Sequence, residues 1–288
     1  MTIEEGYCDV NGARLHYLRA GSGPRAIVLS HGNSHCGGVW APLVEALAGE
    51  QFTVVALDLR GHGWSEKTEE GYDWGSLRDD LVGVVRALDF QDVFYAGHSR
   101  GGGVTLLAAA ATPERARGVV VYEPTVPVQA GPSGEAAPTP APARMAEVAA
   151  RTLRRREVFP SRDELMTYYR SRDGFREWRD DYFQSFIEYG SSVREDGSVE
   201  LCMPPRSAAK LFEATHGFDA WRDVRCPDLP VLVLYGERSG RVIEGRDPAA
   251  GIRTMFPRCE SRIIAGATHT GPMEQPELFE QILREHIG

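Results

Sequence analysis

The feature that most constrains the fold of this chain is a Gly-x-Ser-x-Gly pentapeptide at residues 97–101. It follows the apolar run 93–96 and precedes an alanine- and leucine-rich stretch, 102–111, whose composition favours a helix. Glycine at both outer positions allows a strand to turn directly into a helix, because a Cβ there would collide with a neighbouring element. The pattern therefore predicts that Ser99 stands at the end of a sheet, above the positive end of a helix dipole, where it can act as a nucleophile.

Strand-like and helix-like segments alternate through the first 125 residues. Continuous apolar or β-branched runs, typical of strands covered on both faces, occur at 25–30, 52–57 and 117–122, and an alternating run occurs at 13–20. Helical spacing occurs at 39–48 and 77–88. The same alternation resumes near the end of the chain, with strands at 229–236 and 261–264 and helices at 248–256 and 276–287. This order predicts an α/β fold with a mostly parallel, doubly wound sheet.

The alternation of strand-like and helix-like segments is interrupted between these two parts. Residues 130–143 are rich in Pro, Ala and Gly, which predicts an irregular connector, and residues from about 144 to 222 look helical and carry many aromatic side chains. We therefore predict a core made of residues 1–125 and 223–288, with a helical cap inserted at 126–222. Some of the aromatic rings of this insertion are expected to face a substrate cavity, although spacing does not indicate which.

A serine nucleophile needs a base, and His269 is the preferred candidate. It lies in the loop between the last predicted strand and the last helix, and loops at the carboxyl ends of parallel strands meet in one crevice. The oxyanion formed during acyl transfer needs N–H donors. We predict that the backbone amides of Arg100 and Asn33 supply them, with Gly32 allowing the chain to turn.

Three residues beside the nucleophile and this turn, namely Gly32, His98 and Trp40, are the predicted contacts to substrate. For Trp40 a place in the core is an equally plausible alternative. The side chain of Arg100 is expected to pack beside the start of the helix, with contact to an anionic substrate as the alternative.

Four segments resemble the landmark motifs of the α/β-hydrolase fold superfamily, and they occur in the family's order. They are SHGN at 30–33, DLRGHGWS at 58–65, GHSRGG at 97–102 and GATH at 266–269. The resemblance covers about 7–125 and 225–288. It implies the α/β-hydrolase fold, a Ser-His-acid triad, no cofactor and a variable cap. Such proteins usually hydrolyse esters, thioesters, lactones or amides, and the superfamily also includes C–C hydrolases, perhydrolases, lyases and non-enzymatic relatives.

The chain departs from the family pattern at the triad acid. The family usually places an aspartate in a Gly-x-x-Asp turn after the seventh strand, where this chain has Ser239. Some members, including certain haloalkane dehalogenases and lactone hydrolases, place the acid after the sixth strand, where this chain has Glu123. We predict Glu123 as the acid, and Glu237, Glu244 and Asp247 remain as alternatives. The competing structural interpretation of Glu123 is a buried salt bridge or a helix cap.

Composition excludes several function classes. The formal net charge of −9 argues against a nucleic-acid or anionic-membrane partner. No apolar segment reaches 18 residues, the first residues lack the apolar core of a secretory signal, and no pattern of metal ligands occurs. Five scattered cysteines without a CxxC pair favour free thiols in the cytoplasm. The basic run 154–156 is expected to be a solvated helix face.

These observations predict a monomeric or homodimeric cytoplasmic serine hydrolase whose partner is a small-molecule substrate. Ser99 would attack an apolar ester or lactone of small or medium size, His269 would transfer the proton, and Glu123 would orient the imidazole ring. Two alternatives remain. The same triad could serve perhydrolysis, cyclisation or C–C cleavage, or the protein could be a non-catalytic ligand-binding member of the fold.

Overall fold

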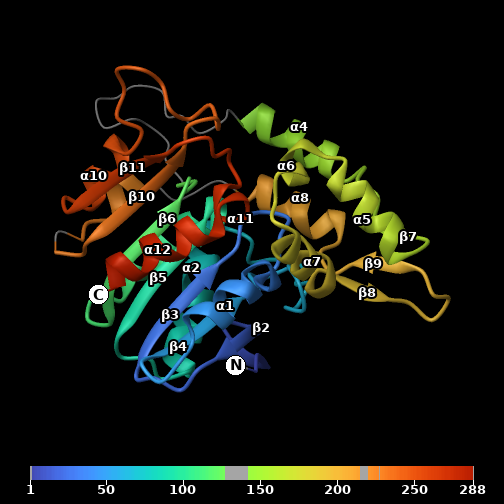
Figure 1. Cartoon of the computed structure of the whole chain (residues 1–288), viewed down its shortest axis with the longest axis horizontal. Helices are drawn as coiled ribbons and strands as arrows, with labels where there is room; N and C mark the ends of the chain where they lie inside the picture. Colours follow the sequence, from blue (N-terminus) through green and yellow to red (C-terminus); the bar gives the residue numbers. More distant parts are fainter. Residues whose placement is uncertain (1, 127–141, 215–219, 227, 288) are drawn as a thin grey trace.

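An eight-stranded, mostly parallel sheet forms the centre of the computed structural model, which describes residues 2–126, 142–214, 220–226 and 228–287 (Figure 1). The strand order is β1-β2-β4-β3-β5-β6-β10-β11, and the pairs from β4 to β11 are parallel. Strand β2 runs antiparallel to both of its neighbours, β1 and β4. The strand bounds are Glu4–Val10 for β1, Ala13–Ala20 for β2, Arg25–Ser30 for β3, Phe52–Leu57 for β4, Val93–His98 for β5, Ala116–Tyr122 for β6, Val231–Gly236 for β10 and Cys259–Ile264 for β11. The predicted α/β fold with a mostly parallel sheet is thereby confirmed.

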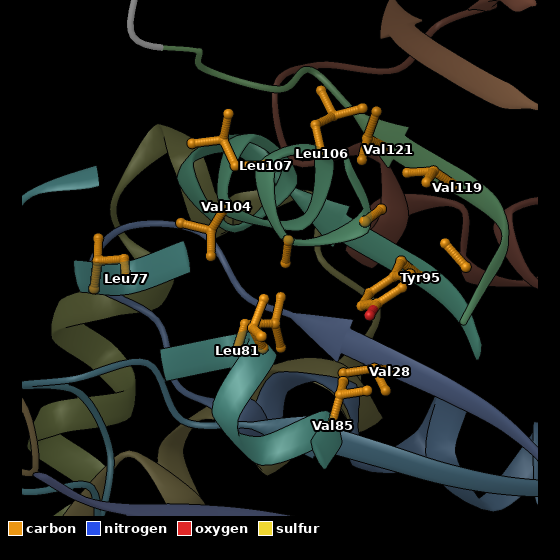
Figure 2. Packing of buried hydrophobic residues seen from close by; sticks show 14 of the residues in the cluster. Val28, Leu77, Leu81, Val85, Tyr95, Val104, Leu106, Leu107, Val119 and Val121 are labelled. Atoms are coloured by element: carbon orange, nitrogen blue, oxygen red, sulfur yellow. The ribbon is translucent and has the colours of Figure 1, made fainter. Parts of the chain in front are cut away.

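Helices cover both faces of this sheet because successive residues of each buried strand point to opposite sides. On one face, α2 (Trp74–Ala87) and α3 (Ser99–Ala111) pack on alternate residues of β3, β5 and β6, such as Val28 and Val119 (Figure 2). On the other face, α1 (Ala41–Leu47) and α12 (Pro276–Ile287) pack on the intervening residues, such as Ile27 and Val120. Each large apolar side chain buried in this way stabilises the fold by about 1.5–3 kcal/mol.

The chain between β6 and β10 forms a separate layer beside the loops of the sheet (Figure 1). It is mostly helical, as expected, and its helices are α4 (Pro142–Thr152), α5 (Arg162–Arg170), α6 (Asp173–Arg176), α7 (Asp180–Tyr189), α8 (Pro205–Glu213) and α9 (Ala220–Asp223). It also contains an antiparallel sheet that the sequence analysis missed, in the order β7-β9-β8. Its strands are β7 (Val158–Phe159), β8 (Ser191–Val193) and β9 (Val199–Leu201). Strands of two or three residues are too short to show a periodic pattern.

Three short helices complete the core. They are the 3-10 helix η1 (Gly37–Trp40) before α1, α10 (Ala250–Met255) between β10 and β11, and α11 (Gly271–Glu274) before α12. A backbone hydrogen bond from Arg179 N to Met273 O, 2.9 Å long, ties α11 to the start of α7. The inserted layer is therefore held directly against the loop region that follows β11.

One prediction about the insertion is wrong. The basic run 154–156 follows α4, which ends at Thr152, and does not lie on a solvated helix face. Arg155 is half-buried and donates a hydrogen bond of 2.7 Å to Ser34 Oγ, on the loop after β3. A charge run looks the same in a sequence whether its side chains face water or a neighbouring loop. Most of the predicted connector, residues 130–141, lies outside the described residues.

The described residues set further limits. None of their helices is both long enough and apolar enough to cross a bilayer. No group of three or more histidine, cysteine or acidic residues in these ranges could hold a metal ion. All five cysteines are free and buried.

Candidate active site

The predicted turn between β5 and α3 places Ser99 at the end of a strand in the middle of the sheet. Ser99 has φ of 54°, a left-handed conformation that non-glycine residues adopt only at a cost. A Cβ at Gly101 would lie 2.3 Å from the carbonyl oxygen of His31, so only glycine fits there. The tight contact between α3 and the end of β3 is what holds the serine in its strained conformation.

His269 reaches Ser99 from the loop between β11 and α11. Its Nε2 lies 3.1 Å from Ser99 Oγ, which is within hydrogen-bond distance. The His269 side chain is 42% exposed, so the ring borders a space open to solvent. The structure thus brings together two residues that are 170 positions apart in the sequence.

Glu123 lies directly after β6 and is the third residue of the group formed with Ser99 and His269. Its Oε2 lies 2.7 Å from His269 Nδ1, and its Oε1 accepts a hydrogen bond of 3.0 Å from Gly236 N. The carboxylate is fully buried, which by itself would raise its pKa. Hydrogen bonds from His269, Ser239 and Gly236 N outweigh burial and hold the pKa of Glu123 below its ordinary value, so the acid is ionised.

The loop after β10 supports this acid although it carries no aspartate at the family's usual position. The Ser239 hydroxyl donates to the Glu123 carboxylate, and Arg241 Nε lies 3.2 Å from Glu123 Oε2. Arg241 also donates to the carbonyl oxygen of Pro124 at 3.1 Å. Sequence analysis missed Arg241, because a single arginine in a loop carries no recognisable signal.

The three alternative acids lie elsewhere. Asp247 forms a surface ion pair with Arg253 at 2.8 Å, and Glu237 accepts from Gly266 N at 2.8 Å. Glu244 is exposed. None of the three contacts the imidazole of His269 in the described structure.

The two predicted oxyanion donors have amides available for a ligand. Arg100 is the second residue of α3, and N–H groups in the first turn of a helix have no acceptor within that helix. The amide of Asn33 makes no hydrogen bond to another described residue, and the following residue, Ser34, has φ of 64°. Donors of this kind stabilise an oxyanion most when they are already in place before the reaction.

The structure gives Gly32 and His98 a supporting place in the site. His98 is buried, and its Nε2 donates a hydrogen bond of 2.8 Å to the carbonyl oxygen of His269. A Cβ on Gly32 would lie 2.7 Å from His98 Nδ1, so this close approach requires glycine. The pair therefore positions the loop that carries the catalytic base. Sequence spacing placed both residues near the site, but it did not reveal this contact.

Trp40 does not join the site. Its ring is fully buried and stacks on Phe279 of α12, with ring centroids 5.8 Å apart. Of the two places that the sequence allowed for this residue, the structure shows the core and does not support a contact to substrate.

A small pocket lies beside the loop after β3 that carries Asn33, which we call the oxyanion loop. Its lining combines Ser34, His35 and Cys36 of that loop with side chains of the inserted layer, among them Arg155, Tyr169 and Phe186. The pocket is therefore formed jointly by the core and the insertion.

Comparison with known proteins agrees with the fold. A family model described as the alpha/beta hydrolase family matches residues 27–282. The N-formylmaleamate deformylase of Pseudomonas putida is 26% identical over 278 residues, which cover 96% of this chain and 94% of that protein.

Other relatives match over shorter segments. The 2-(acetamidomethylene)succinate hydrolase of Mesorhizobium japonicum is 36% identical over 115 residues, and the soluble epoxide hydrolase of Corynebacterium sp. is 43% identical over 100 residues. These matches cover only 41% and 34% of the lengths of the two relatives. A crystal structure of E-2-(acetamidomethylene)succinate hydrolase superposes with a TM-score of 0.81 at 25% identity, covering 99% of both chains.

The family model matches residues 27–282, which is well over half of the chain and includes the strained serine after β5, the glutamate after β6 and the histidine after β11. The chain belongs to the alpha/beta hydrolase family.

Proposed function

We propose that this protein is a serine hydrolase that cleaves a small ester, lactone or amide through an acyl-enzyme formed on Ser99. The observation that carries the proposal is the continuous chain of contacts from Ser99 Oγ to His269 Nε2 at 3.1 Å and from His269 Nδ1 to Glu123 Oε2 at 2.7 Å. A buried carboxylate holds the ring so that Nε2 can accept the serine proton. A non-catalytic protein has no need for such a chain beside two unused amides.

The nucleophile argues for a carbonyl substrate over an epoxide. Attack by the Ser99 hydroxyl on an epoxide would leave an ether on the serine, and water activated by His269 does not cleave an ether. Attack on a carbonyl carbon leaves an ester on the serine, and water activated by His269 hydrolyses this ester and regenerates the serine. The likeness to an epoxide hydrolase is therefore best explained by shared fold and motifs.

Relatives extend the proposal from esters to amides. The names of two of them refer to a deformylase acting on N-formylmaleamate and a hydrolase acting on 2-(acetamidomethylene)succinate. The same triad can cleave both bond types, since each forms the same kind of tetrahedral intermediate. We therefore include small amides with the esters and lactones that the sequence favours.

The decisive experiment measures hydrolysis of chromogenic esters of varied acyl length, lactones and N-acyl amides by the wild type and by Ser99→Ala. We expect turnover by the wild type only, with an acyl-enzyme mass adduct and with labelling of Ser99 by a fluorophosphonate. Circular dichroism of Ser99→Ala checks that folding is intact. Turnover that survives in Ser99→Ala would contradict the proposal, as would a wild type that neither labels nor turns over.

A second measurement separates hydrolysis from other uses of the triad. Adding hydrogen peroxide or an alcohol to the ester assay tests whether the acyl group goes to another acceptor. We expect water to remain the main acceptor at low concentrations of either reagent. Preferential transfer to peroxide would indicate perhydrolysis instead.

A further inference from the structure

The small pocket beside the oxyanion loop has an arginine in its wall, Arg155, that lacks a negative partner. Its half-buried guanidinium donates to Ser34 Oγ at 2.7 Å and to Tyr169 Oη at 3.4 Å. Both acceptors also line the pocket, so the guanidinium lies at the pocket wall. Within the part of the chain that the structure describes, no carboxylate pairs with Arg155, and none of the residues lining the pocket is acidic. Since a guanidinium has five N–H groups, these two contacts leave donors for a ligand.

The two hydroxyl groups beside the guanidinium can donate as well. The oxygen atoms of Ser34 and Tyr169 accept from Arg155, and their own O–H protons remain available for another acceptor. Three donor side chains with a single positive charge therefore meet at the wall of the pocket. Charge-assisted hydrogen bonds make such a set of groups suitable for binding an anion.

His35 connects this pocket to the loop that carries the catalytic base. Its ring lines the pocket and stacks on His98 with centroids 5.7 Å apart, and His98 holds the backbone of His269 through a hydrogen bond of 2.8 Å. Burial lowers the pKa of His35 to about 3, and the positive charge of Arg155 acts in the same direction. His35 is therefore neutral at physiological pH, and the positive charge at the pocket wall belongs to Arg155.

The distance to the reaction centre suits a short ligand. Ser34 directly follows Asn33, whose backbone amide is the predicted oxyanion donor. The path from that amide nitrogen through Ser34 to the Arg155 guanidinium is about 10 Å at most. Two hydrogen bonds of about 2.9 Å, one at each end, leave at most about 4–5 Å for the ligand itself to span. An acyl chain of four or five carbon atoms is long enough for this.

We propose that the Arg155 guanidinium, with the Ser34 and Tyr169 hydroxyls, binds a carboxylate of the substrate, so that the enzyme prefers short acyl compounds bearing a second, ionised acid group. This inference rests on the proposed function for the reaction, whereas the binding can be tested without turnover. A guanidinium forms planar, bidentate hydrogen bonds with a carboxylate, and one cation matches the single charge of that group. Phe186 and Met203, which also line the pocket, suit the carbon chain of such a substrate.

The binding test uses Ser99→Ala, which cannot turn over a substrate. Succinate should raise the melting temperature of this variant in a concentration-dependent manner, and the neutral isostere succinamide should not. Adding Arg155→Met should weaken succinate binding by about 10- to 100-fold, as expected for the loss of hydrogen bonds to a charged group. Arg156→Met is the matched control, because Arg156 is adjacent in the chain, pairs with Glu164 at 2.8 Å and does not line the pocket.

The kinetic test compares monophenyl succinate with phenyl butyrate, which differ mainly by a carboxylate in place of a methyl group. After subtraction of uncatalysed hydrolysis, the wild type should have the higher kcat/KM for monophenyl succinate. Arg155→Met should lower the ratio of the two kcat/KM values by about 10- to 100-fold, and Arg155→Lys, which keeps the charge but not the planar fork, should give an intermediate ratio. Any disturbance of the oxyanion loop through Ser34 slows both esters equally and cancels in this ratio.

The outcomes separate this inference from the hydrolase function. An equal loss for both esters in Arg155→Met would mean that Arg155 only holds the oxyanion loop, and it would overturn the carboxylate site. Turnover of phenyl butyrate by a wild type that neither prefers monophenyl succinate nor binds succinate would also overturn the site and leave the hydrolase intact; this result needs no variant to fold. Arg155-dependent binding of succinate without any ester turnover would support the site and contradict the proposed reaction.

Discussion

Replacing Glu123 by glutamine should slow turnover by about 10⁴-fold without unfolding the protein. The carboxylate is fully buried and lies 2.7 Å from His269 Nδ1. When His269 takes the serine proton, the ring becomes a cation beside this anion. Two opposite unit charges about 4 Å apart attract by about 4 kcal/mol at an effective dielectric constant of about 20. That energy corresponds to about 10³-fold in rate.

The remaining factor comes from the tautomer of His269. A glutamine amide at position 123 can donate to Nδ1, which favours the ring with its proton on Nε2. That tautomer cannot accept the proton of Ser99, and this effect brings the total to the 10⁴-fold seen when a triad carboxylate is replaced by its amide. Exposure of the ring, 42%, allows water to screen part of the charge interaction, so we expect the loss not to exceed this figure.

The assay is kcat/KM on the best ester of the panel, with urea denaturation to check folding. Asp247→Asn is the matched control, because that carboxylate pairs with Arg253 on the surface, and the control should retain wild-type activity. A loss of less than about 10-fold in Glu123→Gln would refute the assignment of the acid.

A double variant tests the same reasoning in the opposite direction. The Ser239 hydroxyl already contacts the Glu123 carboxylate from the loop after β10. Ser239→Asp combined with Glu123→Gln places a carboxylate at the family's usual position, and we expect it to recover at least about 10-fold of the lost rate. Ser239→Asp alone should lower activity, because two adjacent carboxylates would repel each other and one of them would take up a proton.

Three further outcomes follow from the packing around the site. Gly32→Ala should lower the free energy of unfolding by about 1–3 kcal/mol in urea denaturation, since its Cβ would lie 2.7 Å from the buried His98 ring. The control Gly49→Ala, where a Cβ meets open space, should change the free energy of unfolding by less than about 0.5 kcal/mol. Burial lowers the pKa of His35 to about 3, against about 6.5 in an unfolded chain. Between these two pH values the His35 ring is protonated in the unfolded state and neutral in the folded state. The free energy of unfolding should therefore fall by up to about 1.4 kcal/mol per pH unit as the pH drops from about 6.5 towards 3. His35→Phe should flatten that slope in denaturation curves recorded between about pH 7 and 5, and an unchanged slope would count against the argument. Finally, burial raises the pKa of Cys202 and Cys259 to about 11, so a disulfide reagent at pH 8 should titrate the five thiols only after unfolding.

Local patterns in the sequence were sufficient for the architecture and for Ser99 and His269, whereas Glu123 was predicted from the resemblance to the α/β-hydrolase family. Buried parallel strands show as continuous apolar runs, and a turn that tolerates only glycine at two positions shows as Gly-x-Ser-x-Gly. The chain order of these elements then determines which loops share the carboxyl edge of the sheet. Ser99 and His269 could be proposed together for that reason, and the family resemblance added Glu123.

Only the tertiary structure decided what surrounds those residues. Glycine at position 32 is required by a ring 66 positions later in the chain, and Trp40 packs against α12 although it is near the oxyanion loop in sequence. The burial of the Arg100 guanidinium is equally invisible in the sequence, because it depends on which distant carbonyl and aromatic ring cover the side chain. Periodicity reports which face of an element is buried, whereas the partner on that face is set by packing between segments far apart in the chain.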